Sequence, residues 1–262
     1  PLTDLMNRQL GQPLSSEGQV LINRISRDAR RLPEPGERKL APASPDLLRS
    51  FVRDLGSAHP GRVAAAALPE GRVSTAGIEA SMGELCGHTW PNAPLWITAL
   101  RLSDGQRVVF GRDDDAGPRP PIGRAIAASC AIPGYFTPVA FDGDRYVDGG
   151  TTSVCNVDAL MGQDLDFVIV CAPMAIHAGS RLAADTPIRR AVRRQVDREA
   201  ARLSAEGTKV FVFAPVAADI AAMGTNPMAS GREAQVVRSV YASTAERINA
   251  NAELREVLAT AT

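Results

Sequence analysis

The sequence predicts a layered α/β protein in which a largely parallel sheet lies between helices. Two observations lead to this fold class. Apolar runs with strand character alternate with segments of helical periodicity, and 45% of the 262 residues are hydrophobic. A chain of this length and composition can bury a substantial core, and we expect a single domain.

The N-terminal third is predicted to be helical. Residues 1–31 carry apolar side chains at helical spacing. Residues 44–56 begin with a serine and a proline and end with a glycine, which are the residues preferred at those positions of a helix. A further helix is expected from Ser74 or Thr75 to Leu85.

Strands and helices alternate from residue 95 onward. The run 95–102 is almost continuously apolar, as in a strand buried on both faces, and a Ser-Asp-Gly turn joins it to a second strand. The expected elements are strands at 95–102, 107–110, 145–148, 165–170 and 209–213, and helices at 122–131, 187–204 and 232–258.

Composition argues against several classes of function. The formal net charge is zero, so no overall field attracts the protein to nucleic acid, and we expect no nucleic-acid partner. No apolar run approaches the roughly 20 residues of a transmembrane helix. We expect a cytoplasmic or peripheral-membrane protein. Because the sequence begins at Pro1, a preceding signal peptide is an open alternative.

Neither a metal nor a cofactor is expected. Asp142, Asp144 and Asp148 loosely imitate a calcium loop, but the glycine and the distal glutamate are misplaced, and Asp113–Asp115 reads as a solvated loop. The cysteines form no C-x-x-C motif, which argues against a zinc knuckle or a thioredoxin-type pair. We expect reduced, mostly buried thiols at Cys86, Cys130, Cys155 and Cys171.

Asp148 is the most informative residue. A short β-rich run from Arg145 delivers its carboxylate onto a turn made by Gly149 and Gly150. The two glycines are expected to let the backbone turn tightly and to leave room for a substrate. A strand end is also where ligand sites form in α/β sheets. An Asp-Gly pair alone is an ordinary turn, so the surrounding motifs decide how it is interpreted.

Four motifs supply that context. They are L-W-I-T-A at 95–99, A-S-C-A-I-P-G-Y-F-x-P at 128–138, Y-V-D-G-G at 146–150 and N-V-D-A-L at 156–160. In this order they resemble the C-terminal part of the patatin-like phospholipase domain, and the resemblance spans residues 1 to about 215. It implies a layered α/β/α fold truncated at its N-terminus. Residues 1–161 would be the C-terminal part of that domain, and residues 162–262 its continuation with the C-terminal helices.

The resemblance implies a lipid acyl hydrolase that uses a serine–aspartate dyad on a lipid or acyl-ester substrate. In that family the serine lies in a G-x-S-x-G elbow, and the aspartate of the D-G-G motif is the base, which is Asp148 here. The chain contains neither G-x-S-x-G nor the glycine-rich oxyanion loop. We therefore expect a fragment that has no nucleophile and is inactive alone. If leading strands are missing, an apolar edge or face should be exposed beside Asp148.

No other residue is expected to replace the serine. Thr75 lies in V-S-T-A-G, which lacks the first glycine of an elbow, and is interpreted as a helix cap. Ser129 is interpreted as a wall or packing residue, and Ser153 as a turn or cap hydroxyl. The histidines occur in three unrelated contexts and are interpreted as surface or packing residues: His59, His88 and His177.

The helix at 187–204 carries a run of arginines. Their spacing predicts a basic stripe, which could make transient contact with anionic headgroups at a membrane surface. A solvated face balanced by Asp197 and Glu199 is the favoured interpretation, because long apolar anchors are absent. The arginines are Arg189, Arg190, Arg193, Arg194 and Arg198.

Two other functions compete with the hydrolase. One is a noncatalytic patatin-like module that binds acyl chains or a protein partner of unknown identity. The other is an α/β nucleotide-binding domain, which is disfavoured because no G-x-G-x-x-G or Walker-type loop follows a strand.

Overall fold

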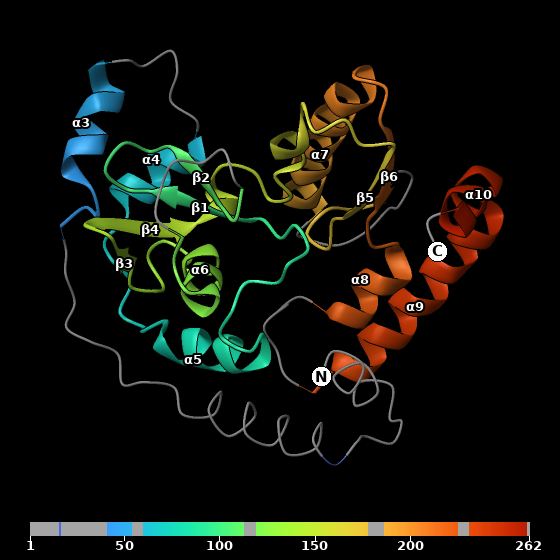
Figure 1. The fold of residues 1–262 in the computed structure, drawn as a ribbon, viewed down its shortest axis with the longest axis horizontal. Coiled ribbons are helices and arrows are strands. Elements are labelled where there is room, and N and C mark those ends of the chain that lie inside the picture. The colour runs from blue at the N-terminus through green and yellow to red at the C-terminus, as the bar shows by residue number, and fades with distance from the viewer. Residues whose placement is uncertain are drawn as a thin grey trace. The chain divides into compact units, whose positions relative to one another are not determined.

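A computed structural model describes residue 16 and residues 41–53, 60–112, 119–177, 186–224 and 231–260 (Figure 1). Gly56, His59, Asp113–Asp115 and all of the helix expected at 1–31 except residue 16 therefore lie outside the described residues. The chain divides into two compact units, with the boundary between Ser153 and Val154. The proposed continuity of one domain across residues 161 and 162 stays a prediction.

The first unit contains a four-stranded sheet in the order β2-β1-β4-β3, and every pair in it is antiparallel. The expectation of a largely parallel sheet is not confirmed. Short turns join β1 to β2 and β3 to β4, and such turns can connect only antiparallel strands. The strands are β1 (Ile97–Arg101), β2 (Arg107–Phe110), β3 (Val139–Phe141) and β4 (Asp144–Asp148).

Asp142 and Gly143, which loosely imitate part of a calcium loop, form the turn between β3 and β4. Both residues have positive φ, 48° and 78°, as expected for a two-residue hairpin turn of type I′. Among the residues that the structure describes, no group of three or more His, Cys, Asp or Glu side chains could hold a metal ion.

Helices cover both faces of this sheet. Helix α6 (Ile122–Ser129) packs its alanines against Ala99, Val139 and Tyr146, because small side chains let a helix approach a sheet closely. On the other face, Leu100, Leu102 and Val147 pack against Ala65 of helix α4 (Pro60–Ala67). The remaining helices of the unit are α3 (Pro45–Arg53) and α5 (Ala76–Leu85). This part of the molecule is thus layered α/β/α, as expected.

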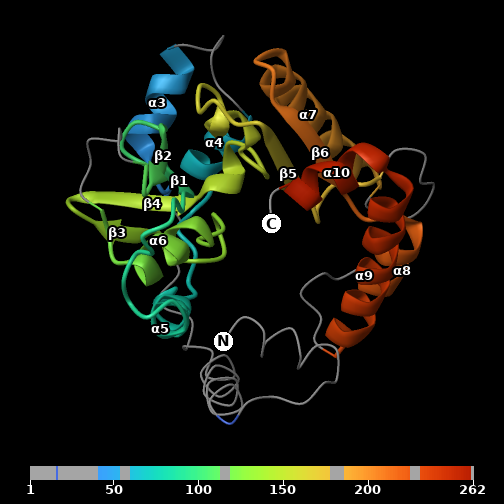
Figure 2. The ribbon, with the colours of Figure 1, turned by 45° about the vertical axis from the view of Figure 1, so that its right-hand side comes forward.

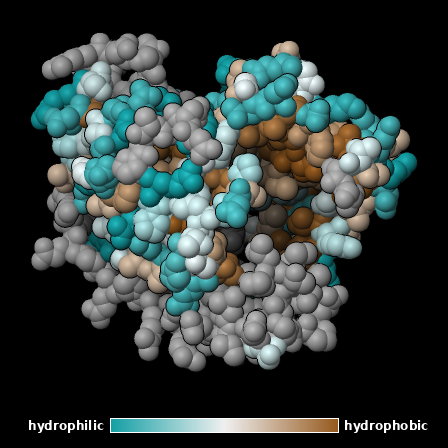
Figure 3. All heavy atoms as spheres, in the orientation of Figure 1, coloured by the Kyte–Doolittle hydropathy of each residue, from teal (hydrophilic) through white to brown (hydrophobic). Residues whose placement is uncertain are grey.

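The second unit is built on a parallel pair of strands. β5 (Phe167–Cys171) and β6 (Lys209–Phe213) are connected by α7 (Thr186–Ala205), a crossover helix of the kind that parallel strands require. The valines of both strands form a core with Val196 and Leu203 of α7. On β5, Ile169 is 40% exposed, and apolar residues gather in this part of the surface, below α7 (Figure 3).

The C-terminal region differs from the single helix expected at 232–258. It forms α9 (Glu233–Ala250) and α10 (Ala252–Thr260), separated at Asn251, whose backbone is extended. The Asn251 side chain accepts a 3.0 Å hydrogen bond from the Leu254 N–H and so begins the next helix. A short helix that was not expected, α8 (Ala217–Met223), packs beside α9 (Figure 2). None of the described helices is long and apolar enough to cross a membrane.

Candidate active site

Asp148 is the last residue of β4, as predicted, and three segments meet there. It is paired with Ala99 of β1, and its N–H donates a 3.0 Å hydrogen bond to the carbonyl oxygen of Ala131, just after α6. The preceding residues, Tyr146 and Val147, are buried in cores on opposite faces of the sheet. A one-residue slip would exchange those faces, so packing determines the position of Asp148.

The turn after β4 holds the carboxylate in one orientation. The N–H of Gly150 donates to Asp148 Oδ1 at 2.7 Å, and Thr151 Oγ1 donates to the Asp148 carbonyl oxygen at 2.7 Å. Within the described residues the Asp148 side chain makes only the Gly150 hydrogen bond. Its second oxygen, Oδ2, is therefore available to accept a proton.

Close packing explains why glycine occupies positions 149 and 150 better than turn flexibility does, since neither Gly149 nor Gly150 has positive φ. A Cβ on Gly149 would lie 2.6 Å from both Thr98 O and Thr98 Oγ1, and a Cβ on Gly150 would lie 3.0 Å from Asp148 Oδ1. The same turn is packed from the other side by α4, where a Cβ on Gly61 would lie 1.9 Å from Thr151 O. The Asp148 turn therefore packs closely against both β1 and α4.

Burial dominates the electrostatic environment of Asp148. The residue is half-buried, and burial raises the pKa of its carboxyl group, while the Gly150 hydrogen bond partly opposes that rise. The described residues provide it with no ion-pair partner. A half-buried, unpaired carboxylate with a raised pKa is a candidate for catalysis.

Cys130, which follows α6, is an electrostatic neighbour of Asp148 that the sequence interpretation did not identify. Burial of its sulfur and then the negative charge of Asp148 raise the pKa of the thiol, so the two side chains lie within electrostatic range. The four cysteines are free, as expected, but the expectation that they are mostly buried is wrong. Cys86, Cys130 and Cys171 are exposed, and Cys155 is half-buried.

The other candidate side chains do not join Asp148. Thr75 is buried and makes no side-chain cap, whereas Ser74 Oγ accepts a 3.2 Å hydrogen bond from the Ala76 N–H. Ser129 is half-buried and Ser153 is buried, and neither is hydrogen-bonded to Asp148. His177 belongs to the second unit, where its N–H donates to the Pro215 carbonyl oxygen.

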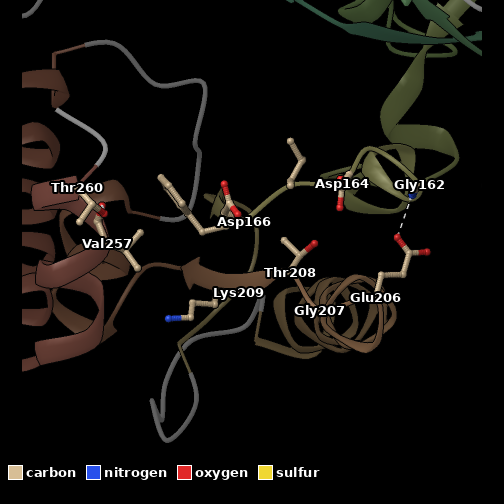
Figure 4. Close-up of a pocket in the computed structure, with 11 residues that line it drawn as sticks. Gly162, Asp164, Asp166, Glu206, Gly207, Thr208, Lys209, Val257 and Thr260 are labelled. Carbon is tan, nitrogen blue, oxygen red and sulfur yellow. Dashed lines mark hydrogen bonds between the residues drawn. The ribbon is translucent and has the colours of Figure 1, made fainter.

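Two of the pockets that described residues line lie away from Asp148. One, of about 430 Å³, lies between α5 and α6 and is lined by His88 and by the ion pair of Glu79 with Arg124. The other, of about 850 Å³, lies where β5 and β6 begin (Figure 4). Its carboxylates come from Asp164, Asp166 and Glu206, and Glu206 accepts a 2.9 Å hydrogen bond from Gly162. Ligands of parallel sheets usually bind at the opposite ends of the strands.

The arginine run on α7 is only partly a solvated face. Arg189 is buried, 3% exposed, and donates to the carbonyl oxygens of Pro173 and Ala175. Arg193 pairs with Asp197 at 2.7 Å. The solvated-face interpretation is therefore wrong for Arg189, which fastens α7 to the segment that follows β5.

Asp148 is expected to destabilise the fold at neutral pH. Because folding raises the pKa of Asp148, the folded state holds this proton more tightly than the unfolded state does. The stability that this proton provides is complete below the ordinary pKa of aspartate and is lost as the pH rises through the folded value. Asp148→Asn keeps an oxygen for the Gly150 N–H, so we expect it to stabilise the protein at pH 7 by about 0.5–1 kcal/mol. Urea unfolding at pH 7 and at acidic pH measures the effect, which should vanish in acid.

Asp104 is a matched control for Asp148, because its pKa is shifted in the opposite direction. It also accepts a turn N–H, from Gln106, but it is paired with Arg101. Burial by itself would raise the pKa of Asp104. The hydrogen bonds and charge of Arg101, together with the Gln106 hydrogen bond, outweigh burial, so the net pKa is lowered. Asp104→Asn should therefore destabilise the protein at pH 7. Equal effects of the two substitutions would contradict the assignment of Asp148 as an unpaired buried acid.

Comparison with protein families places the Asp148 turn within a known domain. The family model described as patatin-like phospholipase matches residues 25–161, slightly more than half of the chain and including the whole Asp148 turn. The search of curated proteins finds no significant match.

Proposed function

The chain belongs to the patatin-like phospholipase family, and we propose that Asp148 is the general base of a serine–aspartate dyad that hydrolyses lipid acyl esters. The observation that carries the proposal is the state of its carboxylate. Oδ1 is held by Gly150, Oδ2 has no partner among the described residues, and burial raises the pKa. A carboxylate with a raised pKa is a stronger base toward an alcohol.

The proposed reaction has two halves. A serine hydroxyl attacks the acyl carbonyl carbon, and its proton passes to Asp148 and then to the leaving alkoxide, which leaves as the alcohol. Water next attacks the acyl-enzyme ester and gives its proton to Asp148, which returns it to the serine oxygen as the fatty acid is released. In each half the oxyanion requires N–H donors.

The sequence offers no serine elbow for this dyad. The sequence contains no G-x-S-x-G, and the side chains of Thr75, Ser129 and Ser153 are not hydrogen-bonded to Asp148. We infer that the serine comes from polypeptide outside this sequence, and that Asp148 acts only when that segment is present.

The chain alone is expected to be inactive as an esterase. Hydrolysis of a p-nitrophenyl acyl ester by the 262-residue chain should equal the buffer rate, and Asp148→Asn should not change it. Hydrolysis that depends on Asp148 would overturn the assignment of the nucleophile to another segment. A serine-reactive fluorophosphonate followed by mass spectrometry would then identify the residue that reacts.

A second experiment, on a longer chain, tests the role of Asp148 as the general base. We expect the codons before Pro1 to encode a strand, G-x-S-x-G and a helix. A chain extended through them should hydrolyse the ester, and Asp148→Asn should lower kcat by about 10²–10⁴-fold, the usual contribution of a general base. An extended chain whose rate ignores Asp148→Asn would refute the dyad.

The second candidate is a noncatalytic patatin-like module that binds acyl chains or a protein. The absence of a G-x-S-x-G motif from the sequence favours it. The two candidates differ in two outcomes. A binding module would take up a fluorescent fatty acid with unchanged affinity after Asp148→Asn, and its upstream codons would lack a serine elbow.

A further inference from the structure

Three apolar side chains are exposed together in the first unit. Leu68 is 43% exposed, Ile132 is 47% exposed and Tyr135 is 52% exposed. Ile132 and Tyr135 belong to one tight turn, because the Tyr135 N–H donates to the Ile132 carbonyl oxygen at 3.2 Å. Leu68 lies against Gly134 in that turn, where a Cβ would be 3.6 Å from Leu68 Cδ1. We call Leu68, Ile132 and Tyr135 the apolar patch.

The turn that carries Ile132 and Tyr135 is fixed at both ends. At its start, the Ala131 carbonyl oxygen accepts the N–H of Asp148. At its end, the Tyr135 carbonyl oxygen accepts the N–H groups of Arg72 and Val73, at 3.1 and 3.2 Å. The backbone of the turn is therefore joined to Asp148 through Ala131, directly before Ile132, and is fixed at Tyr135.

The surrounding sequence is unusually free of charge. No charged residue occurs from 125 to 141, although 22% of the chain is charged, and the 132–135 turn exposes apolar side chains from the middle of this run. Exposed loops are normally polar, so an uncharged, apolar turn that is fixed by backbone hydrogen bonds is a candidate contact surface. Tyrosine suits a surface with an apolar interior and a polar boundary, because its ring is apolar and its hydroxyl is polar.

The size of the patch distinguishes between kinds of partner. Three half-exposed side chains present on the order of 300 Å², well under the roughly 800 Å² that each partner buries in a stable protein interface. Insertion among acyl chains requires no complementary surface, so a small patch suffices for transient binding.

We propose that Leu68, Ile132 and Tyr135 insert among the acyl chains of a lipid surface and place Asp148 at the lipid–water boundary. This inference rests on the proposed function, since it makes the lipid surface the source of the ester substrate. Binding is driven by burial of apolar side chains, and not by the arginines of α7.

Vesicle flotation with phosphatidylcholine and the 262-residue chain tests the proposal. The wild type should float with the vesicles. The double variant Ile132→Ser, Tyr135→Ser should partition at least tenfold more weakly, about 1.4 kcal/mol. The matched control is Ile188→Ser with Tyr241→Ser, whose residues are each 66% exposed in the second unit, and it should bind like the wild type.

Salt dependence identifies the driving force. Binding through the patch should not weaken between about 0.1 and about 1 M NaCl, whereas binding through arginines would be screened over that range. Four results would each overturn the proposal. The patch variant could bind as well as the wild type, the wild type could fail to bind, only the control variant could lose binding, or binding could be strongly salt-sensitive.

Tryptophan fluorescence measures insertion into the bilayer directly, and this measurement does not require the serine variant to fold. Tyr135→Trp should add an emission that shifts to the blue on vesicles and is quenched by brominated lipid, and Tyr241→Trp should not. Absence of quenching at position 135 would contradict insertion. Asp148→Asn should bind vesicles like the wild type, so failure of docking and failure of the proposed base are seen in different assays.

Discussion

Gly149→Ala is expected to destabilise the first unit by at least about 2 kcal/mol and to move Asp148. The new Cβ would lie 2.6 Å from Thr98 O, a backbone atom of β1 that cannot rotate away. The end of β4 would have to retreat from β1, and the carboxylate would move with it. Urea unfolding followed by tryptophan fluorescence measures the loss, because Trp90 and Trp96 are both in the first unit.

Gly77→Ala is the control for this substitution. Gly77 lies in α5, and a Cβ there would meet nothing within 4 Å. We expect this change to stabilise the protein by about 0.5–1 kcal/mol, because alanine loses less backbone entropy in a helix. A Gly149→Ala protein as stable as the wild type would show that the contact between the turn and β1 is looser than the structure places it.

Asp219→Ala is expected to destabilise the second unit by about 2–4 kcal/mol. Asp219 is 1% exposed and accepts hydrogen bonds from Val216 N at 3.0 Å and from Ser239 Oγ and Ser243 Oγ at 2.6 and 2.9 Å. One carboxylate thus caps α8 and fastens it to α9. Alanine would leave three donors without this acceptor in the interior.

Asp219→Asn tests whether the hydrogen bonds or the charge matter. The amide oxygen can still accept from Val216, and a serine hydroxyl can rotate to accept from the amide N–H, so we expect a loss below about 1 kcal/mol. Far-UV circular dichroism during urea unfolding reports on the helices of this unit. Equal losses for alanine and asparagine would mean that the negative charge, and not the hydrogen bonds, stabilises the α8–α9 pair.

Local sequence patterns predicted many of the elements well. β2 and β6 begin and end at the predicted residues, and α7 extends one residue beyond the prediction at each end. Asp148 was predicted at a strand end followed by its glycine turn, and the family resemblance that rests on it is confirmed by the family match. These features depend on periodicity and on turn residues within about ten positions.

Features set by contacts between distant residues were not predicted. The single helix expected at the C-terminus is broken at Asn251, and neither α4 nor α8 was expected as a separate helix. Arg189 looked like one member of a basic stripe, but it is buried on carbonyl oxygens 14 and 16 residues away. Nothing in the local pattern distinguishes it from Arg190, which is exposed.

The sequence by itself determined the family and the Asp-Gly-Gly turn at the end of a strand, because the motifs and turn residues that indicate them can be recognised from the sequence alone. The tertiary structure alone decided that the four-stranded sheet is antiparallel, that Gly149 is required by Thr98 about fifty residues earlier, and that Asp148 is half-buried with one oxygen bound and one without a partner. Strand pairing and burial join residues far apart in the chain, and local composition carries no record of which partner each will meet.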